Sequence, residues 1–225
     1  MVVKVYVDML SQPCRALILF LKNTKIPFEV VTISLRNGDQ KKDEYTKVTP
    51  LNTVPAIQDG DFCLGETVAI IRYLSARYPD RVPDHWYPKD LKKRSRVDEY
   101  MAFHHTGTRG GCCGVFINEI IFPLFNGGKQ VPEEKAKKDL ENMAKQLDKL
   151  ERAFLKNNNW LAGNDISVAD LLAVSEMMQN TVSGRDVTEG RPQLKAFVDR
   201  VKNRLGPTFD EVFAAMYGWR ESFKK

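Results

Sequence analysis

Four adjacent residues, Ser11, Gln12, Pro13 and Cys14, have the types and spacing most suggestive of chemistry in this chain of 225 residues. Two cysteines separated by two residues form a dithiol redox site, in which the first thiolate attacks. Because serine stands at the first position here, the tetrad lacks dithiol chemistry but keeps a hydroxyl. At the start of a helix, where anions are favoured, such a hydroxyl is suited to donate a hydrogen bond to a bound thiolate.

Two other roles are open to Ser11. A serine directly before a helix is commonly an N-cap with no part in chemistry. A serine nucleophile needs a histidine, and the three histidines, His85, His104 and His105, belong to no recognisable nucleophile motif. The sequence therefore disfavours a serine hydrolase and leaves capping and thiolate binding as alternatives.

The tetrad lies between a predicted strand and a predicted helix. The run Val3–Leu10 alternates and is rich in β-branched residues, which is typical of a strand. Residues Cys14–Lys22 are rich in helix formers, and Pro13 suits the first helical position. This is the place of the Cys-x-Pro-Cys turn in thioredoxin-like redox proteins.

The rest of residues 1–78 extends this pattern. Phe28–Ile33 predicts a second strand, Asp59-Gly60-Asp61 between two apolar runs predicts a hairpin, and Glu66–Leu74 predicts a helix. The order strand, helix, strand, hairpin, helix is the thioredoxin-like arrangement. We therefore expect an α/β thioredoxin-like N-terminal domain over residues 1–78.

The second part of the chain predicts helices alone. Three prolines between residues 79 and 88 indicate a linker. Apolar side chains recur every three or four residues from Ala136 to Phe154, which predicts one amphipathic helix. Ser167–Asp170 resembles a capping box at the start of a second helix, and Pro192 suits the start of a third. An all-α C-terminal domain is expected over residues 89–225.

Composition disfavours several classes of protein. The hydrophobic content of 43% supplies a core, and the net charge of +5 comes from basic residues interspersed with acidic ones, which indicates a solvated surface rather than a nucleic-acid site. No run approaches the ~18 apolar residues of a membrane span. The four irregularly spaced cysteines predict neither disulfides nor a metal site, and no secretory signal pattern precedes the first strand. A reduced, cytoplasmic setting is expected.

Two further segments indicate a peptide-like ligand. In thioredoxin-like folds a proline that opens a strand, as in Thr53-Val54-Pro55, lets the preceding backbone pair with a peptide. Glu66-Thr67 at a helix start offers an acid for an ammonium group and free N–H groups for a carboxylate. An ordinary strand-opening proline and simple helix capping are the alternatives. Together with Ser11, the two segments describe a small, anionic, cysteine-containing peptide, and glutathione fits.

These segments also carry a family resemblance. The chain resembles the glutathione transferases, and within them the theta class. The resemblance rests on Asp8–Ala16, Pro50–Ala56, Asp59–Phe62, Glu66–Ile70, Trp86–Pro88, Arg96–Tyr100 and Ile166–Leu171. It implies a thioredoxin-like domain, an all-helical domain, a homodimer and a conjugation reaction with glutathione as co-substrate.

The resemblance implies a role for each matching site residue. Ser11 would donate a hydrogen bond to the glutathione sulfur, with Arg109 near it. The glutathione-binding set would be Val54 with a cis Pro55 at the cysteinyl unit, Glu66 and Thr67 at the γ-glutamyl end, Gln40 and Lys41 at the glycyl carboxylate, and Thr53. Relatives usually have histidine in place of Gln40, lysine in place of Thr53 and often serine in place of Thr67.

Tyr6 and Cys14 are rivals to Ser11, because other transferase classes use a tyrosine or a cysteine at the sulfur. Alternation places Tyr6 in the middle of the predicted strand rather than at the turn. Cys14 lies inside the predicted helix, where a packing role is expected. Ser11 is therefore preferred to both.

The second substrate is expected to bind between the domains, with walls from Leu10, His105, Arg109, Phe116 and the last helix. The glycines at positions 110, 111 and 114 predict a kink or a close backbone approach beside this pocket. The sequence ends at Lys225, before the tail that covers the site in many theta-class relatives, which predicts an open pocket.

The leading hypothesis is an enzyme that joins the glutathione thiolate to small hydrophobic electrophiles, such as alkyl or aralkyl halides and epoxides. Reduction of organic hydroperoxides is a further expected activity. The alternative is a non-catalytic protein that binds glutathione or apolar ligands. A protein-interaction module is disfavoured, because the sulfur-binding and γ-glutamyl-binding residues are all present.

Overall fold

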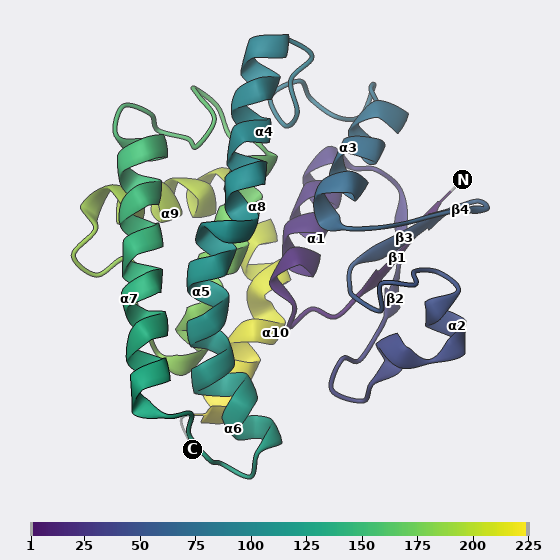
Figure 1. Ribbon diagram of the computed structural model, residues 1–225. Helices are drawn as coiled ribbons and strands as arrows, with labels where there is room; N and C mark the ends of the chain where they lie inside the picture. Colours follow the sequence, from purple (N-terminus) through teal and green to yellow (C-terminus); the bar gives the residue numbers. More distant parts are fainter. Residues whose placement is uncertain (1, 224–225) are drawn as a thin grey trace.

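A four-stranded sheet forms the N-terminal part of the molecule in the computed structural model, which describes residues 2–223 (Figure 1). Its strands are β1 (Val3–Val7), β2 (Phe28–Thr32), β3 (Ala56–Asp59) and β4 (Phe62–Gly65), in the order β2-β1-β3-β4. β1 and β2 are parallel, whereas β1 with β3 and β3 with β4 are antiparallel. The predicted thioredoxin-like arrangement is confirmed.

Helix α1 (Gln12–Thr24) connects β1 to β2 and lies between the sheet and the helical part of the molecule (Figure 1). Its other side contacts α8 and α10, so every residue from Cys14 to Leu21 is buried. Helix α3 (Thr67–Arg77) packs beside α1. The short helix α2 (Asp43–Thr46) and a 3-10 turn, η1 (Asp39–Lys41), lie between β2 and β3. We call the part from β1 to α3 the sheet domain.

The helical domain follows, and apart from an isolated β-bridge between Trp160 and Gly163 its described residues form helices, turns and loops. Its helices are α4 (Leu91–Thr106), α5 (Thr108–Phe116), α6 (Phe122–Phe125), α7 (Glu133–Leu150), α8 (Val168–Gln179), α9 (Pro192–Leu205) and α10 (Pro207–Phe223). Two π-helical turns and one 3-10 turn extend these helices: η2 (Ile117–Ile121), η3 (Glu151–Leu155) and η4 (Asn180–Ser183). None of the helices within residues 2–223 is long and apolar enough to cross a membrane.

Helix α8 forms the centre of the helical domain, since each of its residues is buried. The predicted capping box at its start is confirmed. The Ser167 hydroxyl accepts a hydrogen bond from the Ala169 N–H at 3.3 Å, and the Asp170 carboxylate accepts one from the Ser167 N–H at 2.7 Å. These bonds satisfy N–H groups that have no partner within the helix.

The first strand and the first helix both differ in extent from the prediction. The strand ends at Val7 rather than Leu10, because the Leu10 N–H donates to the Asp8 carboxylate at 2.9 Å and the Ser11 N–H donates to the Asp8 carbonyl at 2.9 Å. Helix α1 begins at Gln12, so Pro13 occupies its second position rather than its first. The prediction that the tetrad forms a strand-to-helix turn is confirmed.

The glycine-rich segment forms a close backbone approach and not a kink. Helix α5 runs through it without interruption, and the break lies earlier, at Gly107. A Cβ atom on Gly111 would lie 3.0 Å from the Gln146 side chain and 3.2 Å from the Met143 backbone. The absence of a side chain therefore lets α5 pack closely on α7.

Candidate active site

Ser11 occupies the N-cap position of α1 with an extended backbone (φ −85°, ψ 126°). Its side chain makes no capping hydrogen bond to the helix. The hydroxyl interacts instead with the Cys14 thiol, and it lies at the N-terminus of α1, a position that favours an anion. The alternative of simple capping is not supported by this geometry.

Ser11 lines a cavity of about 560 Å³ between the two domains. The sheet domain contributes the turn Leu10–Pro13 and the segment Asn52–Val54, and the helical domain contributes α5, η2, α6 and α10. Apolar side chains dominate the helical wall, among them Phe116, Ile117, Ile121, Phe125 and Trp219. Such a mixture of apolar walls and a few polar groups is typical of a small-molecule site.

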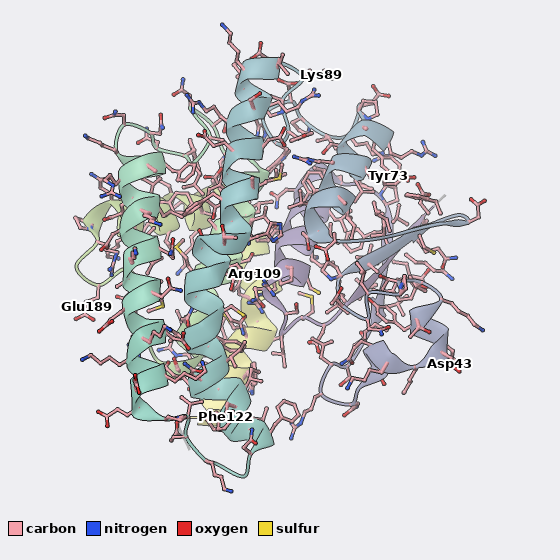
Figure 2. The ribbon with its side chains drawn as sticks, in the orientation of Figure 1. Asp43, Tyr73, Lys89, Arg109, Phe122 and Glu189 are labelled. Carbon is pink, nitrogen blue, oxygen red and sulfur yellow. The ribbon has the colours of Figure 1, made fainter. Side chains whose placement is uncertain are left out.

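Arg109 lies on the same cavity, near the start of α5 and in the middle of the molecule (Figure 2). The prediction that Leu10, Arg109 and Phe116 form walls of one pocket is confirmed. The prediction for His105 is wrong. Its side chain is exposed on α4 and does not line the cavity, because the turn at Gly107 separates α4 from the part of α5 that does.

The segment before β3 forms the sheet-domain wall. The Val54–Pro55 peptide bond is cis, as the resemblance implies. The Thr53 carbonyl accepts a hydrogen bond from the Tyr45 hydroxyl at 2.6 Å, which fixes this segment against α2. Thr53 and Val54 both line the cavity.

Glu66 and Thr67 lie at the same end of the sheet as this segment. The β3–β4 register pairs Ala56 with Gly65, so one residue further along each strand Pro55 is beside Glu66. Glu66 is exposed, with a left-handed φ of 65°, and Thr67 is the first residue of α3 and is buried. A ligand that leaves the cavity along Val54 would therefore meet the N-terminus of α3.

Gln40 and Lys41 lie on η1, between β2 and α2. The Lys41 side chain is exposed, whereas Gln40 is half-buried. The Gln40 Oε1 atom is buried and has no hydrogen-bond partner among the described residues. Neither residue lines the cavity, and Pro55, Glu66 and Thr67 also lie outside its lining.

Glu176 contacts two residues of the cavity and was not among the site residues predicted from the sequence. Its Oε1 atom accepts a hydrogen bond from Gln12 Nε2 at 3.0 Å, and its Oε2 atom accepts one from Arg109 Nη1 at 3.0 Å. The only signal in the sequence was a glutamate within the apolar run of a buried helix, since such a charge needs a partner.

The two rival residues have other roles. The Tyr6 hydroxyl donates to Gln58 Oε1 at 3.1 Å, and Tyr6 lines a different cavity from Ser11. Cys14 is fully buried. Burial raises the pKa of its thiol to about 12, although hydrogen bonds with the Asp8 backbone and the Ser11 side chain lower it. A buried, protonated thiol is a poor nucleophile.

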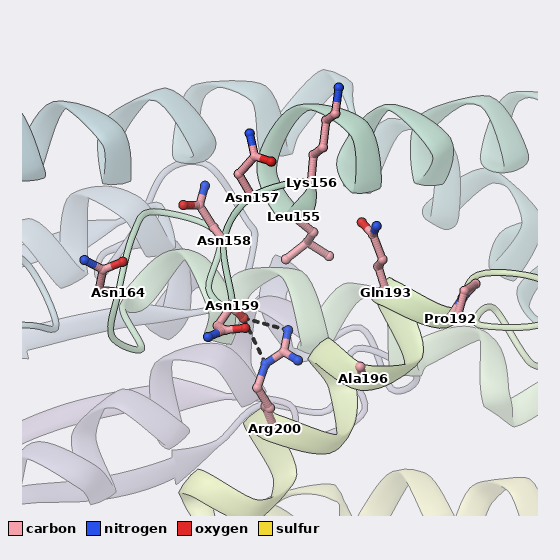
Figure 3. A pocket seen from close by; sticks show the side chains of 10 residues that line it. All are labelled: Leu155, Lys156, Asn157, Asn158, Asn159, Asn164, Pro192, Gln193, Ala196 and Arg200. Carbon is pink, nitrogen blue, oxygen red and sulfur yellow. Dashed lines mark hydrogen bonds between the residues drawn. The ribbon is translucent and has the colours of Figure 1, made fainter.

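A second cavity of about 560 Å³ lies on the far side of the helical domain, between η3 and α9 (Figure 3). Its lining is rich in asparagine, and Arg200 donates from Nε and Nη2 to the Asn159 carbonyl at 3.0 and 2.8 Å. None of the predicted site residues lies there. Across residues 2–223, no group of three or more His, Cys, Asp or Glu side chains is arranged to hold a metal ion.

Comparison with known proteins identifies the family. Residues 5–82 match the glutathione S-transferase N-terminal domain, and residues 115–204 match the glutathione S-transferase C-terminal domain. The chain belongs to the glutathione S-transferase family, and it is a glutathione transferase.

Its relatives include members of the theta class. The chain is 44% identical over 206 residues to glutathione S-transferase theta-1 of Mus musculus, which covers 92% of this chain and 85% of the relative. The structure of human glutathione S-transferase T1-1 in its apo form matches with a TM-score of 0.92 and 40% identity, over 97% of this chain and 91% of that chain. Human glutathione transferase theta-2 in complex with glutathione matches with a TM-score of 0.92 and 38% identity, over 97% and 89%.

Proposed function

We propose that the glutathione thiolate, held by Ser11, attacks small hydrophobic electrophiles such as alkyl or aralkyl halides and epoxides in the cavity between the domains. The observation that carries the proposal is a serine hydroxyl without a capping bond, at a helix N-terminus, on a largely apolar cavity. The hydroxyl donates to the sulfur and is not itself a nucleophile. The thiol first loses its proton to solvent. With a halide, the sulfur forms a bond to carbon as the carbon–halogen bond breaks and the halide ion leaves. With an epoxide, the sulfur forms a bond to a ring carbon as its carbon–oxygen bond breaks, and the oxygen stays in the product and takes a proton from solvent.

The energies involved are sufficient for this role. An ordinary thiol has a pKa of about 8.5, and lowering it by ~2 units needs about 2.7 kcal/mol of thiolate stabilisation. A hydrogen bond to a charged group contributes ~1.5–3 kcal/mol, and a helix N-terminus ~0.3–1 kcal/mol more. Ser11 and the start of α1 therefore supply most of the effect, with the Arg109 guanidinium on the same cavity.

Glutathione would extend from Ser11 along the sheet edge. In this arrangement the Val54 backbone pairs with the cysteinyl unit in the manner of an added strand. Glu66 and the N-terminus of α3, at Thr67, hold the γ-glutamyl group. The glycyl carboxylate lies towards Lys41. The unpartnered Gln40 Oε1 accepts from a glutathione N–H group, and Thr53 borders the path.

The thiolate itself provides the test of this function. Adding glutathione at neutral pH should produce the ultraviolet absorption band of a thiolate, and a small alkyl halide should then be turned over. Binding of glutathione without the band and without turnover would support the non-catalytic binding protein instead. Reduction of an organic hydroperoxide can be monitored by the consumption of glutathione. A positive result would add a peroxidase activity that uses the same thiolate.

We further propose that the enzyme acts as a cytoplasmic homodimer in detoxification. Family membership supports the dimer, and the cysteines support a reducing compartment because all four are free in the described structure. Light scattering during size-exclusion chromatography should give twice the chain mass of 25.7 kDa. A monomer at micromolar concentration would contradict the dimer.

A further inference from the structure

Glu176 connects two elements of the active site through the interior of the molecule. The side chain is 1% exposed and lies on α8. One carboxylate oxygen accepts from Gln12, the residue after Ser11, and the other accepts from Arg109 on α5, each at 3.0 Å. The carboxylate thus spans the start of α1 and the cavity wall of α5.

Helix α1 is held to α8 by a second polar contact, one turn further along. Arg15 is fully buried and donates to the Met9 carbonyl at 2.9 Å, to the Ser175 carbonyl at 3.4 Å and to Gln179 Oε1. Because these bonds fix α1 against α8 without Arg109, the position of Glu176 relative to Ser11 does not depend on Arg109. Glu176 is a fixed acceptor.

Arg109, in contrast, has a long side chain that is 37% exposed. A long, partly exposed side chain has many accessible rotamers unless a contact selects one of them. The bond from Nη1 to Glu176 selects a rotamer at the cavity wall, and the donors on Nη2 and Nε remain for other acceptors.

We propose that Glu176 is a positioning residue for the conjugation reaction, fixing the Arg109 guanidinium in register with Ser11 so that both donors face the same reacting atoms. This inference rests on the role proposed above for Arg109. It differs from a general stabilising role because Glu176 acts through one residue, Arg109.

The charges around Glu176 show whether its carboxylate helps catalysis by orienting Arg109 or by its own charge. Arg109 from α5 and Arg15 from α1 face the carboxylate, and Gln12 donates to it. Burial raises the pKa of the Glu176 carboxyl, and Arg109 followed by Gln12 opposes that rise. The carboxylate charge offsets the attraction of the Arg109 guanidinium for a thiolate. Its benefit to catalysis therefore comes from orienting Arg109.

Two substitutions test this role. Glu176→Gln keeps an oxygen that accepts from Arg109, and its amide donates to Gln12 once the Gln12 amide turns over. Glu176→Leu keeps the volume but removes the acceptor. We expect Glu176→Leu to lower kcat about tenfold with the KM for glutathione changed less than about twofold, and Glu176→Gln to lose no more than about threefold in kcat.

A double-mutant cycle with Arg109→Ala decides the mechanism. If Glu176 acts through Arg109, Glu176→Leu has no further effect on kcat in the Arg109→Ala background. Ser175→Ala is the matched control, because Ser175 is adjacent on α8, equally buried, and its Oγ has no hydrogen-bond partner within residues 2–223. It should keep the kinetics and the melting temperature of the unchanged protein.

Additive losses in the cycle, or a KM for glutathione that rises as much as kcat falls, would show a structural role and overturn the inference. A normal kcat for Glu176→Leu together with a reduced kcat for Arg109→Ala would overturn the inference about Glu176 but leave the proposed role of Arg109 in place. A normal kcat for Arg109→Ala would overturn the role proposed for Arg109 as well. If Glu176→Leu does not fold, the cycle is made with Glu176→Gln instead. The smaller loss of kcat caused by Glu176→Gln must then vanish in the Arg109→Ala background.

Discussion

The two walls of the cavity are held in place by different kinds of contact. The Ser11 turn is fixed by hydrogen bonds to one residue, Asp8. Its carboxylate accepts from the N–H groups of Leu10 and Leu35 at 2.9 and 3.0 Å, and its carbonyl accepts from the Ser11 N–H at 2.9 Å. The helical wall consists of side chains from α5, η2, α6 and α10. Among them, Phe116 and Trp219 pack edge to face with ring centres 5.8 Å apart. The Ser11 wall, which is held by hydrogen bonds, suits one unchanging ligand such as glutathione. The helical wall, which is made of packed apolar side chains, suits electrophiles that differ in shape.

The largest expected effect comes from the wall that carries Ser11. Ser11→Ala should slow conjugation roughly 10²-fold, because it removes one donor to a developing or existing anion. The KM for glutathione should change little, since the other contacts remain. Steady-state rates at saturating glutathione provide the measurement.

Cys14→Ala is the control for Ser11, as the neighbouring sulfur is buried in α1. It should lower the stability but leave the rate per folded molecule unchanged. If the Ser11 variant kept the full conjugation rate, or if the Cys14 variant lost it, the assignment of the sulfur-binding role to Ser11 would be wrong.

The helical domain should respond to acid through His104. This side chain is 5% exposed beside Tyr100, and burial, with His105 and Arg109, lowers its pKa from 6.5 to about 3. The folded state thus binds fewer protons than the unfolded state between pH 6.5 and about 3, so stability falls as the pH decreases through this window. Between pH 7 and 5 the loss due to His104 should be about 2 kcal/mol.

Urea unfolding at pH 7 and pH 5 measures this loss. His104→Gln should remove the contribution of His104 to this loss, whereas His105→Gln, at the exposed neighbouring position, should keep it. Equal pH dependence in the His104→Gln variant and the unchanged protein would refute the assignment.

The smallest effect is expected for the packing of the helical wall. Phe116→Leu should change the KM for a bulky electrophile about threefold, which is the size expected for a modest change in a hydrophobic pocket. The KM for glutathione should stay constant, because Phe116 lies on the other wall. Phe62→Leu, on β4 and 44% exposed, is the control. A change in the KM for glutathione at Phe116 would show that the two walls are not independent.

Features determined by neighbouring residues were predictable from the sequence. The capping box of Ser167 and Asp170 spans four residues, and the hairpin turn needs Gly60 because its φ is 67°. The turn at Ser11 was also predictable, although the end of β1 at Val7 was not. The alternating pattern continues to Leu10, and it does not show that the Asp8 carboxylate accepts from the Leu10 N–H and also from the Leu35 N–H, 27 residues away.

The sequence by itself therefore determined the two-part fold, the hydroxyl at the start of α1 and the absence of a second cysteine there. Only the tertiary structure decided which side chains share the cavity with Ser11. It excluded His105, and it joined Arg109 to Glu176 across 67 residues of chain. The physical reason is that periodicity shows which face of a helix is buried, whereas the packing of the helices decides what each buried or half-buried side chain contacts.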